Sequence, residues 1–160
     1  ALPGMRGCAV GKSKDWRGAP PVKTDKGWLL VFHAVDEDPA RRRDVLAGKG
    51  WCKRYTCGAA LFDKDDPTRL AAITRQPLIV AEAPYETGYE GIWVEDTIFP
   101  VGAILNPHDT GELMIYYGAG DANTCLATVK LEELLQEMTP ARRLAERAVV
   151  PFRIEDWDGK

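Results

Sequence analysis

An internal echo between two strand-like segments places the strongest constraint on the fold. GWLLVFHAV begins at Gly27, and GELMIYYGA begins 84 positions later at Gly111. A short strand and a turn precede each segment, and a loop and a small-residue strand, CGAALFD or CLATVKL, follow it. Such a repeated strand–turn–strand–loop–strand unit is typical of β-propeller blades, and a β-sandwich fits the same periodicity equally well.

Most of the remaining pattern is also β. Apolar runs bounded by turn residues predict strands over residues 22–24, 28–35, 55–63, 96–105, 112–118 and 124–129, with extended pieces at 73 and 78–80. Leucines at helical spacing predict a helix over 130–138. Thr139 as N-cap and Pro140 at the first helical position predict a second helix over 140–147. No β-α-β alternation is present, so the sequence predicts an all-β class with a helical tail.

Chain length and composition limit the expected number of domains, the classes of binding partner and the cellular location. We expect one domain in 160 residues, divided into an arm at 1–17, blades at 18–129 and a helical tail at 130–160. A net charge of −3 gives no basic field, so no nucleic-acid partner is expected, and no apolar run is long enough to predict a membrane partner. Four cysteines without a CxxC pair and two histidines without zinc-ligand spacing predict reduced thiols, no metal site and a cytoplasmic location.

Lys23 and His33 lie on the two strands of the first predicted hairpin and are the first candidate functional residues. If the loop has three residues with Gly27 left-handed, Lys23 lies opposite Leu29 and shares a sheet face with His33; a two-residue loop reverses that face. On one face, the two side chains would make a contact for an anion such as phosphate. The alternatives are a solvated lysine and a histidine satisfied in the core.

A second constellation follows the strand at 112–118. The run YYGAGD ends in Asp121, where glycines permit a sharp turn and the carboxylate could accept hydrogen bonds from sugar hydroxyls. Its alternative role is turn formation, which aspartate favours. Further carboxylates that could pair for glycoside chemistry, most of them expected to be solvated, are Glu86, Glu90, Glu95 and Asp96.

Four ordered motifs carry a family resemblance. GAPPVKTDKGWLLVFHAV, YTCGAALFDKDDPTRL, PYETGY and IFPVGAIL…GELMIYYGAGD resemble glycoside hydrolase family 130 and cover roughly residues 18–135. That family contains β-mannoside phosphorylases and β-1,2-mannosidases on a five-bladed propeller. The resemblance implies about three blades here and the C-terminal half of a longer enzyme. Ala34 stands where glycine is common, and residues 85–102 are longer and more acidic than the family pattern.

By the same resemblance, Lys23 and His33 match phosphate-contact residues, and Tyr55 and Asp121 match sugar-contact residues. The family's general acid would lie in the missing N-terminal half, so no catalytic residue is assigned and the isolated chain is expected to be inactive. The expected reaction is inverting phosphorolysis of β-mannoside oligosaccharides to mannose 1-phosphate, with inorganic phosphate as co-substrate and no cofactor. Hydrolysis, and a non-catalytic carbohydrate-binding module, are the alternatives. Unpaired blade edges predict self-association, or pairing with the missing half.

Overall fold

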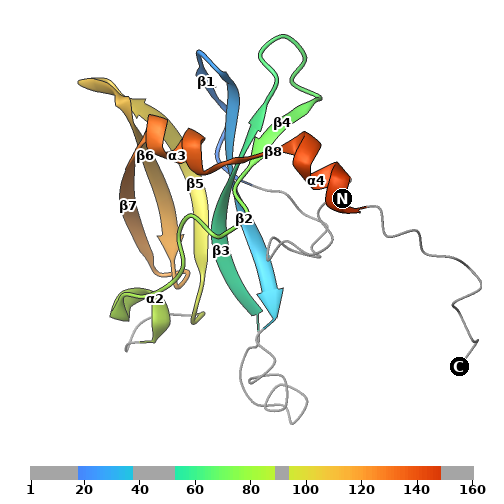
Figure 1. Ribbon diagram of the computed structural model, residues 1–160. Coiled ribbons are helices and arrows are strands. Elements are labelled where there is room, and N and C mark those ends of the chain that lie inside the picture. The colour runs from blue at the N-terminus through green and yellow to red at the C-terminus, as the bar shows by residue number, and fades with distance from the viewer. Residues whose placement is uncertain (1–17, 38–52, 89–93, 149–160) are drawn as a thin grey trace, which may run out of the picture.

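The computed structural model describes residues 18–37, 53–88 and 94–148, which form two antiparallel sheets and a few short helices. Figure 1 shows the sheets side by side, with the helices at their margins. The first sheet has the order β1-β2-β3-β4-β8, built from β1 (Val22–Thr24), β2 (Gly27–Glu37), β3 (Lys53–Phe62), β4 (Leu70–Ile73) and β8 (Thr139–Pro140). The second has the order β5-β6-β7, built from β5 (Ile98–Asn106), β6 (Asp109–Ala119) and β7 (Asn123–Lys130). The prediction of a mostly β chain is confirmed.

The main hydrophobic core lies between the two sheets. Alternate residues of β2, such as Leu29 and Val31, are fully buried against alternate residues of β6, such as Leu113 and Ile115. Residues two apart share a face of the strand, because successive side chains point to opposite faces. The two echoed segments of the sequence are therefore the central packing strands of the two sheets.

The outer faces of the two sheets differ. The outer face of the first sheet buries Phe32 and Ile73 together with Leu144 of helix α4 (Ala141–Ala148), which lies beside β4 in Figure 1. The second sheet leaves Ile104 and Leu126 each 48% exposed, and the bulge residue Val101 is 55% exposed. One sheet is thus covered on both faces within this chain, whereas the other is covered on one.

The helical predictions are partly confirmed. Helix α3 (Leu131–Glu137) follows β7 as expected and buries Leu134 in the main core. The second tail helix begins at Ala141, because Thr139 and Pro140 pair with β4 as strand β8 instead of starting the helix. A short helix, α2 (Pro84–Thr87), was not predicted, and Pro84 stands at its first helical position. Within the described residues, every helix is too short or too polar to span a bilayer.

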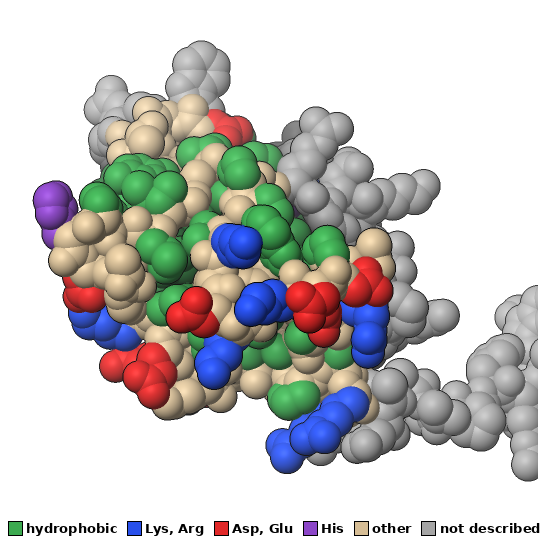
Figure 2. Space-filling model, turned by 90° about the horizontal axis from the view of Figure 1, so that it is seen from above, with side chains coloured by type: hydrophobic (Ala, Val, Ile, Leu, Met, Phe, Trp, Pro, Cys, Tyr) green, Lys and Arg blue, Asp and Glu red, His purple; other side chains and the backbone are tan. Residues whose placement is uncertain are grey.

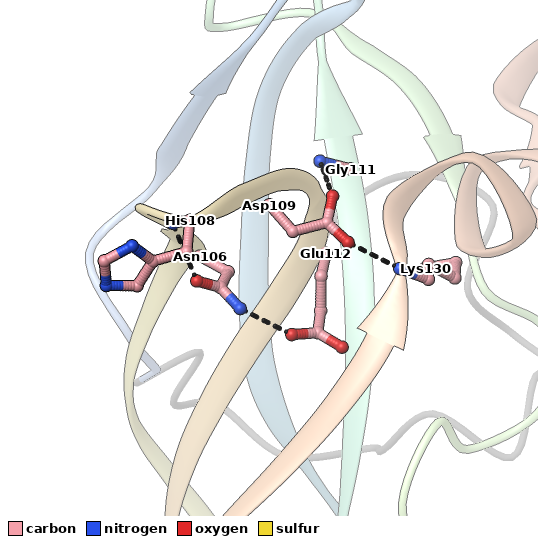
Figure 3. Close-up of polar contacts among 6 residues, drawn as sticks. All are labelled: Asn106, His108, Asp109, Gly111, Glu112 and Lys130. Carbon is pink, nitrogen blue, oxygen red and sulfur yellow. Dashed lines mark hydrogen bonds and ion pairs between the residues drawn. The ribbon is translucent and has the colours of Figure 1, made fainter.

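We call the end of the sheets that carries the β1–β2, β3–β4 and β5–β6 connections the turn end. Figure 2 looks down on it and shows charged side chains of both signs interspersed. Its exposed charged residues include Asp25, Lys26, Lys64, Asp65, Asp66 and Asp109. At the β5–β6 turn, Lys130 Nζ lies 2.7 Å from Asp109 Oδ2, and Asn106 Nδ2 donates to Glu112 Oε2 at 2.7 Å (Figure 3). Lys130 and Asp109 remain about half exposed in this contact, and the contact between Asn106 and Glu112 is partly buried.

Candidate functional site at the opposite end of the sheets

The opposite end, which we call the site end, is where β2 ends, β3 and β5 begin and β6 ends. His33 on β2 is only 7% exposed, and its ring stacks on Phe99 of β5 with 4.5 Å between ring centroids. The ring of Tyr55 lies 5.8 Å from that of His33. Because Val35 pairs with Tyr55 in the β2–β3 register, His33 and Tyr55 share the face turned toward the second sheet. The structure therefore brings these two predicted site residues together.

Lys23 does not join them, and the prediction that it shares a face with His33 is wrong. Thr24 pairs with Gly27, so the loop contains two residues and Lys23 lies opposite Trp28. The Thr24 hydroxyl stabilises this turn by donating to the Gly27 carbonyl at 2.8 Å and accepting from the Lys26 N–H at 3.2 Å. Lys23 is exposed, and its Nζ lies 5.6 Å from the centroid of the Trp28 ring.

Distance separates Lys23 and His33 as well. Trp28, the partner of Lys23, precedes His33 by five positions along β2. At about 3.3 Å per residue this is roughly 17 Å along the strand. The Lys23 side chain is therefore at the turn end on one face, and the His33 side chain is at the site end on the other. A single phosphate cannot contact both in this structure.

Asp121 lies at the site end, in a tight turn between β6 and β7. Gly120 and Asp121 have φ angles of 58° and 52°, and the Ala122 N–H donates to the Ala119 carbonyl at 3.1 Å. Aspartate is among the few non-glycine residues that adopt this left-handed conformation readily. Asp121 thus has the turn position that was the alternative to its predicted sugar contact, and its side chain is exposed.

The segment before β5 connects these residues through the backbone. The Tyr55 N–H donates to the Asp96 carbonyl at 2.9 Å, and the Gly120 N–H donates to the Thr97 carbonyl at 3.0 Å. Asp96 has a φ of 53°. Within the described residues, Asp96 and Asp121 are the two non-glycine residues with positive φ, and the hydrogen bond between Gly120 and Thr97 joins their segments. Aspartate tolerates this conformation better than most residues do, and the hydrogen bonds of the two segments hold both aspartates in it.

Glu86 on α2 is the residue that the sequence interpretation placed least well. We expected a solvated carboxylate, but Glu86 is only 4% exposed. Its Oε2 accepts hydrogen bonds from the backbone N–H groups of Glu82 and Ala83, both at 2.8 Å, and its Oε1 accepts from the Tyr117 hydroxyl at 2.8 Å. The signal available in the sequence was Pro84 at the first helical position followed by glutamate at the third, which is a helix-start pattern.

Burial and hydrogen bonding shift the pKa values of Glu86 and Tyr117. Burial raises the pKa of Glu86, but the hydrogen bonds from Glu82, Ala83 and Tyr117 outweigh it, so the net shift is downward. Burial and the Glu86 carboxylate together raise the pKa of the Tyr117 hydroxyl. Glu86 is therefore ionised at neutral pH and has no proton to give to a leaving group. Of the other three carboxylates considered, Glu95 is exposed, Asp96 is half-buried and Glu90 lies outside the described residues.

The buried thiol of Cys57, which also lies at the site end, is not a candidate nucleophile. Burial raises the pKa of Cys57 to about 12, so it stays protonated and is a poor nucleophile. Cys57 and Cys125 are both free thiols, as predicted, whereas Cys8 and Cys52 lie outside the described residues.

Comparison with known proteins identifies the family. Residues 14–139 match the family model of glycoside hydrolase family 130, described as beta-1,4-mannooligosaccharide phosphorylase. The chain is 32% identical over 122 residues to a beta-1,2-mannobiose phosphorylase of Listeria innocua and 34% identical over 123 residues to a 4-O-beta-D-mannosyl-D-glucose phosphorylase of Bacteroides fragilis. Each match covers 76% of this chain, and the chain spans only 28% and 27% of those relatives.

The fold is similar to solved structures of the same group. A beta-1,2-mannobiose phosphorylase from Listeria innocua, solved with beta-1,2-mannobiose, superimposes with a TM-score of 0.58 at 30% identity. That match covers 75% of this chain and 28% of the other. The sequence match and the structural match agree in their extent, and together they show that this chain belongs to glycoside hydrolase family 130.

Proposed function

We propose that this chain is part of an enzyme that cleaves β-mannosides with phosphate and releases mannose 1-phosphate. The observation that carries this proposal is the family match over residues 14–139, supported by relatives named as phosphorylases of β-mannosides. In the proposed reaction a phosphate oxygen attacks the anomeric carbon and the bond to the leaving oxygen breaks. A carboxylic acid protonates that oxygen, and direct attack inverts the anomeric configuration.

The proposed contacts lie at the site end. His33, held by its stacking on Phe99, is the proposed phosphate contact, because an imidazole N–H can donate to an anion. Tyr55 and Asp121 are the proposed sugar contacts, supported by their placement on the two sides of the Asp96–Thr97 segment. Lys23 is not included in this arrangement, since it lies on the other face of its sheet and at the turn end.

The general acid is proposed to come from outside these 160 residues. Glu86, the buried carboxylate at the site end, is ionised and occupied by hydrogen bonds, so it does not fit that role. The matched relatives are more than three times longer than the stretch they share with this chain. The isolated chain is therefore expected to bind substrate groups without turning them over.

The same difference in length supports a proposed architecture. We propose that the two sheets are blades of a propeller, completed by the portion of the relatives that this chain lacks. The outer face of the β5-β6-β7 sheet supports this, because it exposes Ile104 and Leu126 where the first sheet has its corresponding face covered. A second copy of the chain covering that face is the competing outcome, and light scattering of the purified chain distinguishes the two.

The test combines turnover with binding. The purified chain is incubated with β-1,2-mannobiose and phosphate, and mannose 1-phosphate is measured; none is expected. Backbone NMR titrations with each compound are expected to shift the amides around His33 for phosphate and those around Tyr55 and Asp121 for mannobiose. Turnover by the isolated chain would contradict the proposed origin of the acid, and the absence of any shift would contradict the binding roles.

Complementation then addresses the reaction itself. The chain is combined with the portion of the Listeria innocua relative that it does not match. Mannose 1-phosphate formed only when phosphate is present supports phosphorolysis, whereas free mannose formed without phosphate would instead indicate hydrolysis. Sugar binding with neither product would favour a non-catalytic carbohydrate-binding module.

A further inference from the structure

Glu86 is a buried charged group that the proposed reaction does not use. Its two carboxylate oxygens together accept hydrogen bonds from three donors: the N–H groups of Glu82 and Ala83 and the hydroxyl of Tyr117. A carboxylate at 4% exposure with three fixed donors is locked in orientation. Tyr117 belongs to the buried face of β6, so Glu86 ties α2 directly to the second sheet.

The backbone of Glu86 continues this connection toward the site end. Its carbonyl accepts a hydrogen bond from the Asp96 N–H at 3.0 Å, and the Asp96 carbonyl accepts one from the Tyr55 N–H at 2.9 Å. The next carbonyl, that of Thr97, accepts from Gly120, which immediately precedes Asp121. The Asp96–Thr97 pair is therefore bonded to the backbone on both sides of the site, and α2 is bonded to that pair.

The left-handed backbone of Asp96 is restrained on both sides. A φ of 53° is a left-handed conformation, which aspartate adopts more easily than most residues but which is still less favourable than ordinary backbone. Hydrogen bonds to neighbouring residues help to keep it in that conformation. The Asp96 N–H donates to the carbonyl of Glu86, whose side chain is bonded to Tyr117. The Asp96 carbonyl accepts from the Tyr55 N–H.

We propose that Glu86 is a positioning residue for the sugar contacts of this enzyme. By anchoring α2 to Tyr117, it fixes the Asp96–Thr97 segment, and that segment sets the places of Tyr55 and of the Asp121 turn. The inference rests on the proposed function only for the identity of the ligand. The mechanical part, from Tyr117 through Glu86 and Asp96 to Tyr55, rests on the hydrogen bonds alone.

The substitution that tests this is Tyr117→Phe, because it removes one hydrogen bond to Glu86 and keeps the buried ring. Tyr116→Phe is the matched control: it makes the same chemical change one residue away, on the less buried face of β6. Amide hydrogen exchange is measured residue by residue on the full chain. Tyr117→Phe is expected to speed exchange at the Asp96 and Tyr55 amides about tenfold, the size expected for a lost hydrogen bond to a charged group. Exchange at Leu113 and Ile115 is expected to change no more than in Tyr116→Phe.

Three outcomes separate the possibilities. Equal acceleration at every amide of Tyr117→Phe would mean a general loss of stability and would overturn the positioning role. Faster exchange at Asp96 and Tyr55 with an unchanged affinity for β-1,2-mannobiose would overturn the link to sugar binding. If the unaltered chain itself does not bind β-1,2-mannobiose, the proposed function fails, and the exchange pattern still decides whether Glu86 positions this segment.

Discussion

The turn end and the site end of this molecule use the same kinds of polar side chain in opposite ways. At the turn end, Asp109 contacts Lys130 with both side chains about half exposed. At the site end, Glu86 is buried and accepts hydrogen bonds from Tyr117 and two backbone groups. The two residues first predicted to bind one phosphate, Lys23 and His33, are also divided between these ends.

The difference lies in what water can replace. An exposed carboxylate that loses its partner is solvated again, so the contact contributes little to stability. A buried carboxylate or its buried donors cannot recover those hydrogen bonds from bulk water, so losing either partner is costly. The same distinction makes the site end the better place for groups whose orientation matters to a ligand.

Removal of the buried Glu86 carboxylate should give the largest loss of stability. Glu86→Ala leaves three donors without their acceptor and should lower the free energy of unfolding by about 3 kcal/mol. Glu82→Ala is the matched control, because it removes an exposed carboxylate from the same segment and keeps the backbone N–H that Glu86 accepts. Urea denaturation of both variants measures the difference. Equal losses would show that burial of Glu86 does not matter.

The next test compares the two former partners. His33→Ala removes a buried ring stacked on Phe99 and should lower the free energy of unfolding by about 2 kcal/mol. Lys23→Ala removes only an exposed cation near Trp28, and the expected loss is about 0.5 kcal/mol or less. Denaturation of the two variants under identical conditions decides it. A larger effect for Lys23→Ala would contradict the assignment of the two residues to different ends.

The buried Glu86 carboxylate should also change how stability depends on pH. The pKa of Glu86 is lower in the folded chain than its ordinary value of 4.5, so its contribution is complete above that value. The contribution is then lost as the pH falls below 4.5 and through the folded pKa. Stability should therefore fall less steeply on acidification in Glu86→Gln than in the unaltered chain. Parallel curves for the two proteins, measured by thermal unfolding below pH 5, would count against a special role for this carboxylate.

The smallest effect is expected at the turn end. Lys130→Ala breaks the exposed contact with Asp109 and should leave the melting temperature unchanged within experimental scatter. The Asn106–Glu112 contact of the same turn remains in this variant and keeps the hairpin comparable. Thermal unfolding at low and high salt checks the result. A salt-sensitive loss as large as that of Glu86→Ala would erase the distinction between the two ends.

Much of this distinction could not be predicted from the sequence, although the elements could. The strands, the tail helices and the family motifs follow from local patterns of apolar and turn residues. The face of Lys23 depended on whether one hairpin loop holds two or three residues, and the Thr24 hydroxyl decided this. The burial of Glu86 could not be predicted, because its side-chain partner Tyr117 is 31 positions away, although Pro84 and Glu86 together form a helix-start pattern.

The sequence by itself determined an all-β chain of glycoside hydrolase family 130, because the period of apolar residues and the ordered motifs are properties of neighbouring positions. It also placed His33 and Tyr55 on strands and Asp121 in a turn after one. Only the tertiary structure decided which of these residues meet: β2 and β3 put His33 beside Tyr55, and the Asp96–Thr97 segment joins Tyr55 to the turn of Asp121. The physical reason is that a one-residue change in strand register moves a side chain to the opposite face, and in a hairpin the loop length and turn type fix that register.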